Sequence, residues 1–389
     1  MEGDFITIKK SLLPLSWIYG LAVKVRNFFF DVGVLKSRSF QMPVISVGNI
    51  TVGGTGKTPH VEYLIRLLHQ SFKVAVLSRG YKRKKKGFIV ADDGSKARDI
   101  GDEPYQMKRK FPDVTVAVDK KRVHGIELLT KTDDELDVVL LDDAYQHRYV
   151  KPGVNILLVD YHRMIMHDKL LPAGRLREPE KGKSRADIVI VTKCPRDMKP
   201  MEFRVITKAM GLFPFQNLFF TMLDYGELQP LFPEAPAWEG PLNAVPNVLL
   251  LTGIASPRQL QEDLAPMIPN ITLLSFPDHH DFRWRDVERI ASLFLSMPSP
   301  KIIITTEKDA ARLINMRGLD EDVRKSLYVL PVHIRFMQQQ QEEQFNEIIT
   351  SYVRKNSRDS ILAKRKDDHK SHDGYSPGDG ARTISFRNN

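Results

Sequence analysis

The chain has 389 residues, 42% of them hydrophobic and 27% charged, which excludes a wholly disordered protein, a collagen-like chain and a coiled-coil rod. Lysine and arginine number 58 against 48 aspartates and glutamates, and the resulting net charge of +10 suits nucleic acid, an anionic membrane face or a phosphorylated substrate. A single cysteine, Cys194, excludes an intrachain disulfide framework and a multi-cysteine zinc site, so we expect a globular protein of two domains in the reducing cytosol.

Residues 1–42 are predicted to form an amphipathic, membrane-associating segment. Their most apolar stretch, Leu12–Val23, is followed by Lys24 and Arg26, so the run is too short and interrupted to span a membrane, which takes about 20 mostly apolar residues. The two cations also stand where a secretory signal would carry its small-residue cleavage site. Basic and aromatic residues together are typical of a segment that lies in a membrane interface. The same pattern fits a helix packed on the protein's own core, and both interpretations stay open.

Residues 43–230 alternate short β-branched runs with amphipathic segments of helical length. This alternation is typical of a parallel sheet with covering helices. Pro59–His69 and Arg122–Thr130 place apolar residues at helical spacing and are predicted to be crossover helices. Nearly continuous apolar runs predict six buried strands, Val44–Val47, Val74–Leu77, Val114–Val118, Val138–Leu141, Ile156–Val159 and Ile188–Val191.

Residues 231–355 are predicted to form a second, smaller α/β domain. It opens with Leu231–Val245, which is rich in proline and polar residues and is typical of a linker or a surface excursion. The amphipathic segment Val287–Leu295 predicts a helix. Four further strands are expected at Val248–Leu251, Ile271–Leu274, Ile302–Thr305 and Leu327–Leu330. Residues 356–389 contain few large apolar side chains and are predicted to be a disordered tail.

The first strand leads into a glycine-rich loop, and a helix is predicted to begin at Pro59. Backbone N–H groups of such a loop surround phosphate oxygens, Lys57 would reach the β and γ phosphates, and the Thr58 hydroxyl would bind magnesium. The strict pattern has glycine where this chain has Thr51, but the buried strand before the loop and the helix after it supply the required setting. The predicted ATP-binding residues are Thr51, Val52, Gly53, Gly54, Thr55, Gly56, Lys57 and Thr58.

Acidic residues follow two other predicted strands. Asp142 and Asp143 end the strand that begins at Val138, where phosphate-loop enzymes hold magnesium, although an acidic turn would give the same pattern. Asp102, in the sequence GDEP, could accept the proton of a hydroxyl that receives a phosphoryl group. It could equally be the N-cap of the helix that follows, and its residue type does not decide between these roles.

Eight short motifs follow one another along the chain, from the first strand through the second domain. They are ISVGNITVGGTGKTP (45–59), SRGY (78–81), GDEP (101–104), LLDDAYQHR (140–148), LLPAGRLREP (170–179), IVIVTK (188–193), FPDHH (276–280) and TTEKDA (305–310). Each alone is weak, but together and in this order they resemble the tetraacyldisaccharide 4′-kinase family of lipid A biosynthesis. The family's phosphate loop looks like TVGGTGKT, which accounts for Thr51.

The resemblance implies a P-loop kinase that uses ATP and Mg²⁺. The γ-phosphoryl group would pass to the 4′-hydroxyl of a tetraacyldisaccharide 1-phosphate, a lipid A precursor. Because that acceptor is a lipid, the resemblance favours peripheral attachment of the N-terminal segment to the cytoplasmic face of the bacterial inner membrane. It implies no nucleic-acid partner.

The resemblance also assigns roles to individual residues. Asp102 would be the general base, assisted by His279, although spacing alone cannot distinguish His279 from His280. The magnesium region would contain Thr58, Glu103, Asp142 and Asp143. The substrate or phosphate region would contain Arg79, Arg122, Arg177 and Glu178.

Two other functions are considered. A membrane-associated regulatory ATPase of the partitioning type has a similar loop, but that loop has lysine where this chain has Val52, and the motifs after Gly80 would be unexplained. A nucleic-acid binder would explain the net charge, but no recognised nucleic-acid motif accompanies the basic residues.

Overall fold

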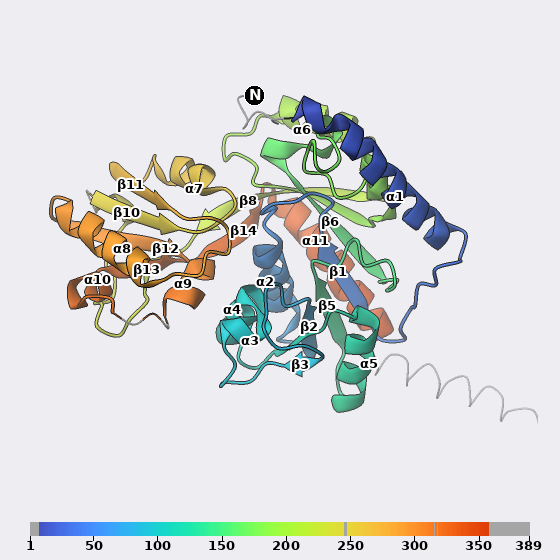
Figure 1. Cartoon of the computed structure of the whole chain (residues 1–389). Helices are drawn as coiled ribbons and strands as arrows, with labels where there is room; N and C mark the ends of the chain where they lie inside the picture. Colours follow the sequence, from blue (N-terminus) through green and yellow to red (C-terminus); the bar gives the residue numbers. More distant parts are fainter. Residues whose placement is uncertain (1–7, 245–246, 315, 317, 358–389) are drawn as a thin grey trace, which may run out of the picture.

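The computed structural model describes residues 8–244, 247–314, 316 and 318–357, and within them the chain forms two sheets (Figure 1). The larger sheet has nine strands, all parallel except its two edge strands β14 and β3. In spatial order they are β14 (Val332–Phe336), β8 (Asn217–Tyr225), β7 (Ile188–Thr192), β6 (Val154–Asp160), β1 (Val44–Gly48), β5 (Val138–Asp142), β2 (Val74–Ser78), β4 (Thr115–Val118) and β3 (Ile89–Val90). The predicted parallel sheet is therefore confirmed.

Helices cover both faces of this sheet, as the sequence pattern predicted. On one face, α2 (Lys57–Leu68), α4 (Asp102–Lys110) and α11 (Gln339–Asn356) bury apolar side chains in a shared core. On the other face lie α5 (Arg122–Thr132) and α6 (Pro200–Met210), each over its own apolar cluster. Because the central strands are parallel, their carboxyl ends lie at one edge of the sheet, where open α/β sheets bind ligands.

The smaller sheet has five strands. Their order is β11 (Asn270–Ser275), β10 (Asn247–Thr252), β12 (Lys301–Thr306), β13 (Leu327–Leu330) and β9 (Gln229–Pro230). Its helices are α7 (Pro257–Leu264), α8 (Trp284–Ser296), α9 (Glu307–Leu313) and α10 (Glu321–Lys325). Short helices complete the described residues: α3 (Ala97–Ile100), η1 (Lys10–Leu12), η2 (Tyr161–Arg163), η3 (Ile165–His167), η4 (Glu180–Arg185) and η5 (Leu242–Ala244).

The chain returns to the larger sheet after β13. Strand β14 pairs antiparallel with β8, and α11 buries Phe345, Ile349 and Val353 in the core of the larger sheet. The smaller domain was expected to run through residue 355, whereas residues 332–356 pack on the first domain. The sequence could not indicate this, because an apolar strand and an amphipathic helix fit either sheet. The tail was predicted over residues 356–389; Asn356 is instead the last residue of α11, and residues 358–389 lie outside the described residues.

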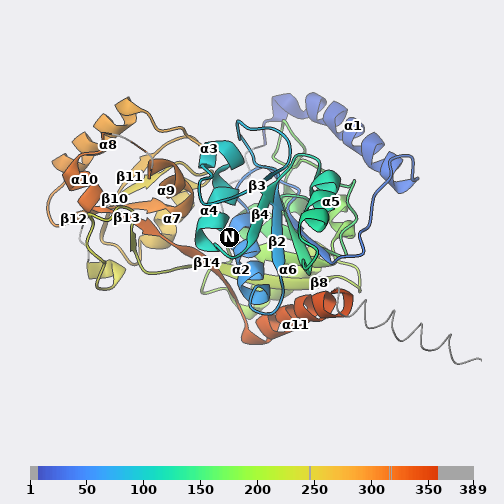
Figure 2. The same cartoon turned by 90° about the horizontal axis from the view of Figure 1, so that it is seen from below.

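Helix α1 (Leu13–Asp31) lies along the outside of the larger domain, on the side away from the smaller sheet (Figure 1 and Figure 2). Its buried positions include Ser16 and Gly20, while Trp17 is 72% exposed and Ile18 67%. The apolar side of this helix thus faces outward, which is the reverse of a core-packed helix. Of the helices in the described part of the chain, none is long and apolar enough to cross a membrane.

Candidate active site

The glycine-rich loop lies between β1 and α2, as predicted. Gly53 and Gly56 have φ values of 123° and 77°, which residues other than glycine rarely adopt. Side chains outside the predicted set hold the loop in place: Asn49 Nδ2 donates to Thr55 Oγ1 at 2.8 Å, and Thr192 Oγ1 donates to the Thr55 carbonyl at 3.1 Å. These contacts fix the loop that leads into α2. The backbone N–H groups at the N-terminus of a helix favour a bound anion.

His60, one turn into α2, supports the same loop. Its Nδ1 lies 2.7 Å from the Gly56 carbonyl, and its Nε2 lies 3.1 Å from Thr221 Oγ1 on β8. A carbonyl can only accept, so Nδ1 carries the proton and Nε2 accepts from the threonine hydroxyl. Burial lowers the pKa of His60 to about 4, which keeps the ring neutral. The sequence analysis missed this residue.

Lys57 and the paired aspartates meet at the carboxyl edge of the sheet. Lys57 Nζ lies 3.6 Å from Asp143 Oδ1, and Arg177 Nη1 lies 3.5 Å from Asp143 Oδ2. Burial acts to raise the pKa of Asp143, but Lys57 and Arg177 outweigh it and lower the pKa. Asp143 is therefore ionised beside the phosphate loop.

Asp142 has a different environment. It is fully buried, and its Oδ2 accepts from Ser78 Oγ at 3.0 Å, while its Oδ1 has no hydrogen-bond partner among the described residues. Burial, followed by the nearby charges of Glu103 and Asp143, raises its pKa to about 7. Three carboxylates thus lie close together, and the positive charges of Lys57 and Arg177 lie beside Asp143.

Arg122 was expected in the substrate or phosphate region, but in the structure it is buried beneath the paired aspartates. It is 2% exposed, and its guanidinium donates to the carbonyls of Asp119 at 2.6 Å and Asp142 at 2.9 Å. Burial lowers its pKa to about 10. In this structure Arg122 supports the backbone beneath the paired aspartates and does not present its charge to a cavity.

Asp102 and His279 come from different domains and meet. Asp102 is the first residue of α4, and Gly101 occupies the N-cap position that had been considered for Asp102. His279 Nδ1 lies 3.1 Å from Asp102 Oδ2, and Lys308 Nζ lies 3.1 Å from His279 Nε2. Because the lysine donates to Nε2, the ring proton lies on Nδ1, which donates to the carboxylate.

A third residue, Arg312, binds the same carboxylate. Its Nη2 lies 2.6 Å from Asp102 Oδ2, a contact that the sequence analysis missed. Burial acts to raise the pKa of Asp102, but the hydrogen bonds from His279 and Arg312 prevail and lower the pKa to about 2. His280 has other partners: its Nε2 lies 2.9 Å from Asp286 Oδ2, and its ring stacks on Phe276. The geometry therefore selects His279 as the partner of Asp102.

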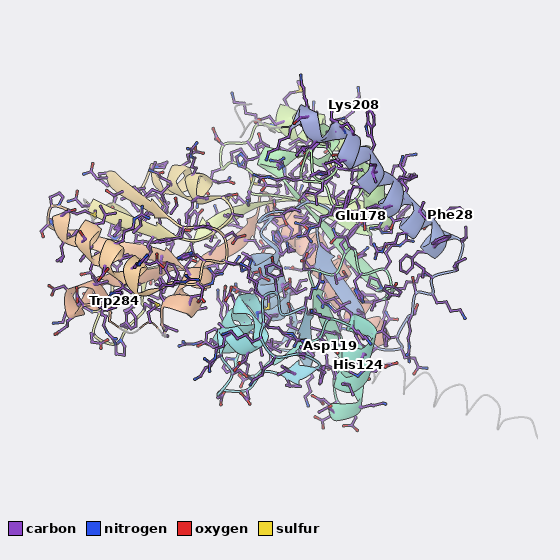
Figure 3. The ribbon with its side chains drawn as sticks, in the orientation of Figure 1. Phe28, Asp119, His124, Glu178, Lys208 and Trp284 are labelled. Carbon is purple, nitrogen blue, oxygen red and sulfur yellow. The ribbon has the colours of Figure 1, made fainter. Side chains whose placement is uncertain are left out.

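Two cavities lie on either side of the phosphate loop. The first, which we call the α1 cavity, has a volume of about 470 Å³ and lies between the loop and α1. Figure 3 shows Glu178 beside α1. The lining of the α1 cavity includes Tyr19, Val52, Arg79, Glu103, Arg177 and Glu178, so it brings three of the four residues predicted for the substrate or phosphate region together.

The second, the interdomain cavity, has a volume of about 200 Å³. Gly54, Gly56 and Thr58 of the phosphate loop form one side, and residues of the smaller domain, among them Ile254 and Leu260, form the other. Glu103, the neighbour of Asp102 in the chain, lines both cavities. Among the described residues, no group of three or more histidine, cysteine or acidic side chains is arranged to hold a metal ion.

Comparison with known proteins places these features in one family. The family model described as tetraacyldisaccharide-1-P 4′-kinase matches residues 8–353. Proteins named tetraacyldisaccharide 4′-kinase are 58% identical over 364 residues in Phocaeicola vulgatus and 53% identical over 381 residues in Bacteroides thetaiotaomicron. The alignments cover 92% and 95% of this chain, and 99% and 100% of those proteins. A crystal structure of LpxK from Aquifex aeolicus in complex with ATP is 30% identical, with a TM-score of 0.67, and the match covers 88% of this chain and 98% of that one.

Proposed function

The chain belongs to the tetraacyldisaccharide 4′-kinase family, and from that premise we propose how its own residues perform the reaction. The protein is an ATP-dependent 4′-kinase of the lipid A pathway. It transfers the γ-phosphoryl group of ATP to the 4′-hydroxyl of a tetraacyldisaccharide 1-phosphate. The observation that carries our assignment of roles is that residues of the phosphate loop line both cavities and that Glu103, the chain neighbour of Asp102, lines both as well.

ATP is assigned to the interdomain cavity. The triphosphate would lie on the loop N–H groups at the start of α2, with Lys57 near the transferred group. Ile254 and Leu260, from the smaller domain, would contact the adenosine part, which accounts for the apolar lining on that side. Nucleotide binding would therefore bring the two domains together.

Mg²⁺ fits the residues present. Asp142 and Asp143 each keep a buried Oδ1 without a hydrogen-bond partner among the described residues, and Glu103 adds a third carboxylate nearby. Together with the Thr58 hydroxyl these would hold Mg²⁺, and phosphate oxygens and water would complete its coordination, as is usual for this ion. When bound, Mg²⁺ supplies positive charge that neutralises the phosphate oxygens.

Asp102 is assigned as the general base. Because its pKa is about 2, it is ionised at physiological pH and can accept a hydrogen bond and then the proton from the 4′-hydroxyl. His279 and Arg312 fix its orientation from the smaller domain. Most of the rate enhancement in phosphoryl transfer comes from such positioning and from charge neutralisation.

The acceptor is assigned to the α1 cavity. Arg79 and Arg177 provide positive charge near a phosphorylated sugar, while Tyr19 and Val23 of α1 provide contacts for its acylated part. The exposed apolar face of α1 continues from this cavity to the outside of the molecule and would enter the lipid interface. We place the protein peripherally on the cytoplasmic face of the bacterial inner membrane, where its lipid acceptor would be reached.

An ATP-dependent phosphorylation assay with the disaccharide 1-phosphate lipid tests the proposal. Product mass identifies the added phosphate, and position is read from the sugar ring by NMR. We expect phosphate at the 4′ position only, and a requirement for Mg²⁺ that EDTA removes. Phosphate at another hydroxyl, or ATP hydrolysis without lipid phosphorylation, would refute the assignment of the acceptor site.

A further inference from the structure

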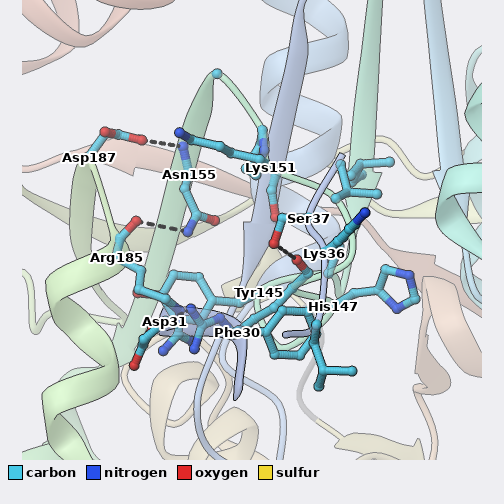
Figure 4. A pocket seen from close by; sticks show the side chains of 18 of the residues that line it. Phe30, Asp31, Lys36, Ser37, Tyr145, His147, Lys151, Asn155, Arg185 and Asp187 are labelled. Carbon is cyan, nitrogen blue, oxygen red and sulfur yellow. Dashed lines mark hydrogen bonds and ion pairs between the residues drawn. The ribbon is translucent and has the colours of Figure 1, made fainter. Parts of the chain in front are cut away.

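A third cavity, apart from the two assigned above, lies on the face of the larger sheet that α5 and α6 cover. It has a volume of about 930 Å³, and we call it the sheet cavity. Phe30, at the end of α1, and Tyr145 contribute aromatic rings to it (Figure 4). Helices α5 and α6 cover the same face of the sheet on either side, over separate clusters. The sheet cavity occupies the gap that these helices leave over β1 and β6.

The buried part of this cavity is polar. Ser46 of β1 and Asn155 of β6 are paired in register, so their side chains lie next to each other on one face of the sheet. They are only 1% and 9% exposed. Asn155 Nδ2 donates to the Arg185 carbonyl at 3.0 Å, but Asn155 Oδ1 and Ser46 Oγ have no hydrogen-bond partner among the described residues.

Buried polar atoms are seldom left without a partner, because each costs free energy when it loses water. A carbonyl oxygen can only accept, whereas a serine hydroxyl can both donate and accept. One or two ligand hydroxyls would satisfy both atoms at once. The buried end of the sheet cavity therefore favours a hydroxylated group.

The cavity lining carries charges of both signs with an excess of cations, because Lys36, Arg148, Lys151 and Arg185 line it together with Asp31 and Asp187. Asp31 is paired with Arg148 at 2.6 Å, and Arg185 is paired with Glu178 at 2.6 Å. Lys36 and Lys151 also line the cavity, and among the residues that the structure describes neither has an ion-pair partner. An anionic group would therefore be favoured near these two exposed lysines.

Exposed apolar side chains lie close in sequence to Phe30, Asp31 and Lys36, which line the cavity. Phe28, Val32 and Val34 are 58%, 53% and 66% exposed, and they lie in the segment that leads to Lys36. The cavity thus combines buried polar atoms without partners with two lysines, and the segment that supplies Lys36 also carries exposed apolar side chains. A hydroxylated headgroup, a phosphate and acyl chains occur together in the anionic glycerophospholipids.

We propose that the sheet cavity binds the glycerol phosphate headgroup of such a phospholipid. The headgroup hydroxyls meet Ser46 and Asn155, and the phosphate meets Lys36 and Lys151. The proposal rests on the attachment of α1 to a membrane, which is part of the proposed function.

Binding is tested with dihexanoyl phosphatidylglycerol, below its micelle concentration, by calorimetry on the full chain. We expect one lipid per chain.

The double variant Lys36→Gln, Lys151→Gln should bind about 30-fold more weakly, because each lysine near an anionic group contributes a little over fivefold. Ser46→Ala, which removes a hydroxyl without a partner and should fold, is expected to weaken binding as well. The control Lys96→Gln, Lys131→Gln makes the same charge change at exposed positions elsewhere and should bind like the wild type.

Other ligands distinguish recognition of a glycerol phospholipid from recognition of charge alone or of a soluble phosphate. Dihexanoyl phosphatidylserine should bind more weakly than the glycerol lipid, and equal affinity would mean that charge alone is recognised, which overturns the proposal. Equal affinity for free glycerol 3-phosphate would point to a soluble ligand and overturn the lipid assignment. Unchanged affinity in the Lys36, Lys151 double variant would place the lipid elsewhere.

Vesicle sedimentation separates this proposal from the membrane attachment on which it rests. A variant with serine at Trp17, Ile18 and Leu21 that no longer sediments with vesicles but still binds the short-chain lipid would support the sheet cavity as a separate site. Wild-type protein that binds the short-chain lipid but not vesicles would overturn the attachment alone. Wild-type protein that binds neither would overturn both.

Discussion

The guanidinium group of Arg312 on α9 lies against the carboxylate of Asp102 on α4, with Nη2 2.6 Å and Nε 3.1 Å from Oδ2. The side chains are only 8% and 16% exposed, so the pair is much less screened than a surface ion pair. Lys110 and Glu307 join the same two helices at 2.6 Å. The orientation of Asp102 in the larger domain therefore depends on a residue of the smaller one.

Arg312→Gln should lower kcat by about 10- to 100-fold with a smaller change in KM for ATP, because Asp102 loses the group that orients it. Arg312→Lys keeps the charge and should lose less. The pKa of Asp102 should rise toward its ordinary value in Arg312→Gln, which would move any acidic limb of the rate profile to higher pH. Arg324→Gln, which breaks an exposed pair in the same domain, is the control. Unchanged kcat in Arg312→Gln would show that the contact does not matter for catalysis.

Asp102→Asn should reduce kcat far more than it raises KM for ATP, because it removes a proton acceptor and not a nucleotide contact. His279→Ala should do the same more mildly, and the double variant should cost less than the product of the two single effects, since the residues act as a pair. Steady-state kinetics at saturating ATP measure all three.

The neighbouring histidine is the natural control for this pair. His280 packs on Phe276 and bonds to Asp286, so His280→Ala should lower thermal stability and leave kcat close to wild type. If His280→Ala proved the more damaging to kcat, the choice of His279 would be wrong.

Lys57→Ala and Thr58→Ala should each abolish kinase activity without unfolding the protein. The first removes the cation expected at the transferred phosphate, and the second removes a hydroxyl assigned to Mg²⁺. Circular dichroism checks the fold, and a lipid phosphorylation assay checks activity. Wild-type turnover by either variant would remove the basis for the nucleotide site.

Replacing Trp17, Ile18 and Leu21 of α1 by serine should weaken binding to anionic vesicles and lower activity on the long-chain acceptor, while ATP binding stays intact. All three side chains are more than 60% exposed, so their replacement leaves the core unchanged. Alkaline carbonate should release the wild-type protein from membranes. Retention through that wash would favour an integral attachment, and a misfolded serine variant would indicate that this face packs on protein.

His60 should make stability depend on pH. Its pKa is about 4 in the folded protein and about 6.5 in the unfolded chain, so between these values the unfolded state binds more protons and stability falls as the pH falls. Between pH 7 and 5 the loss attributable to this residue is about 2 kcal/mol. His60→Gln should remove that part of the slope, which urea unfolding at both pH values measures in the absence of nucleotide. Parallel pH slopes for the two proteins would contradict the buried neutral state.

Local sequence patterns were sufficient to predict most of the strands and the position of the glycine-rich loop. The ten predicted strands, the phosphate loop from Thr51 to Thr58 and the acidic end of β5 all lie where their residues predicted them. These features depend on neighbours in the chain: β-branched runs favour strands, and glycines allow the backbone angles that the loop requires. The glycine-rich loop and the acidic end of β5 lie at the same edge of the sheet because β1 and β5 are parallel.

Tertiary structure decided the rest. Asp102 is separated by 177 positions from His279 and by 210 from Arg312, and no local pattern records such contacts. Folding also buried Arg122 beneath Asp142, although the family resemblance had implied a phosphate contact, and it turned the apolar side of α1 outward. The physical reason is the same in each case: residue type and spacing define what a side chain can do, but burial and partners are set by segments that meet only when both sheets have formed.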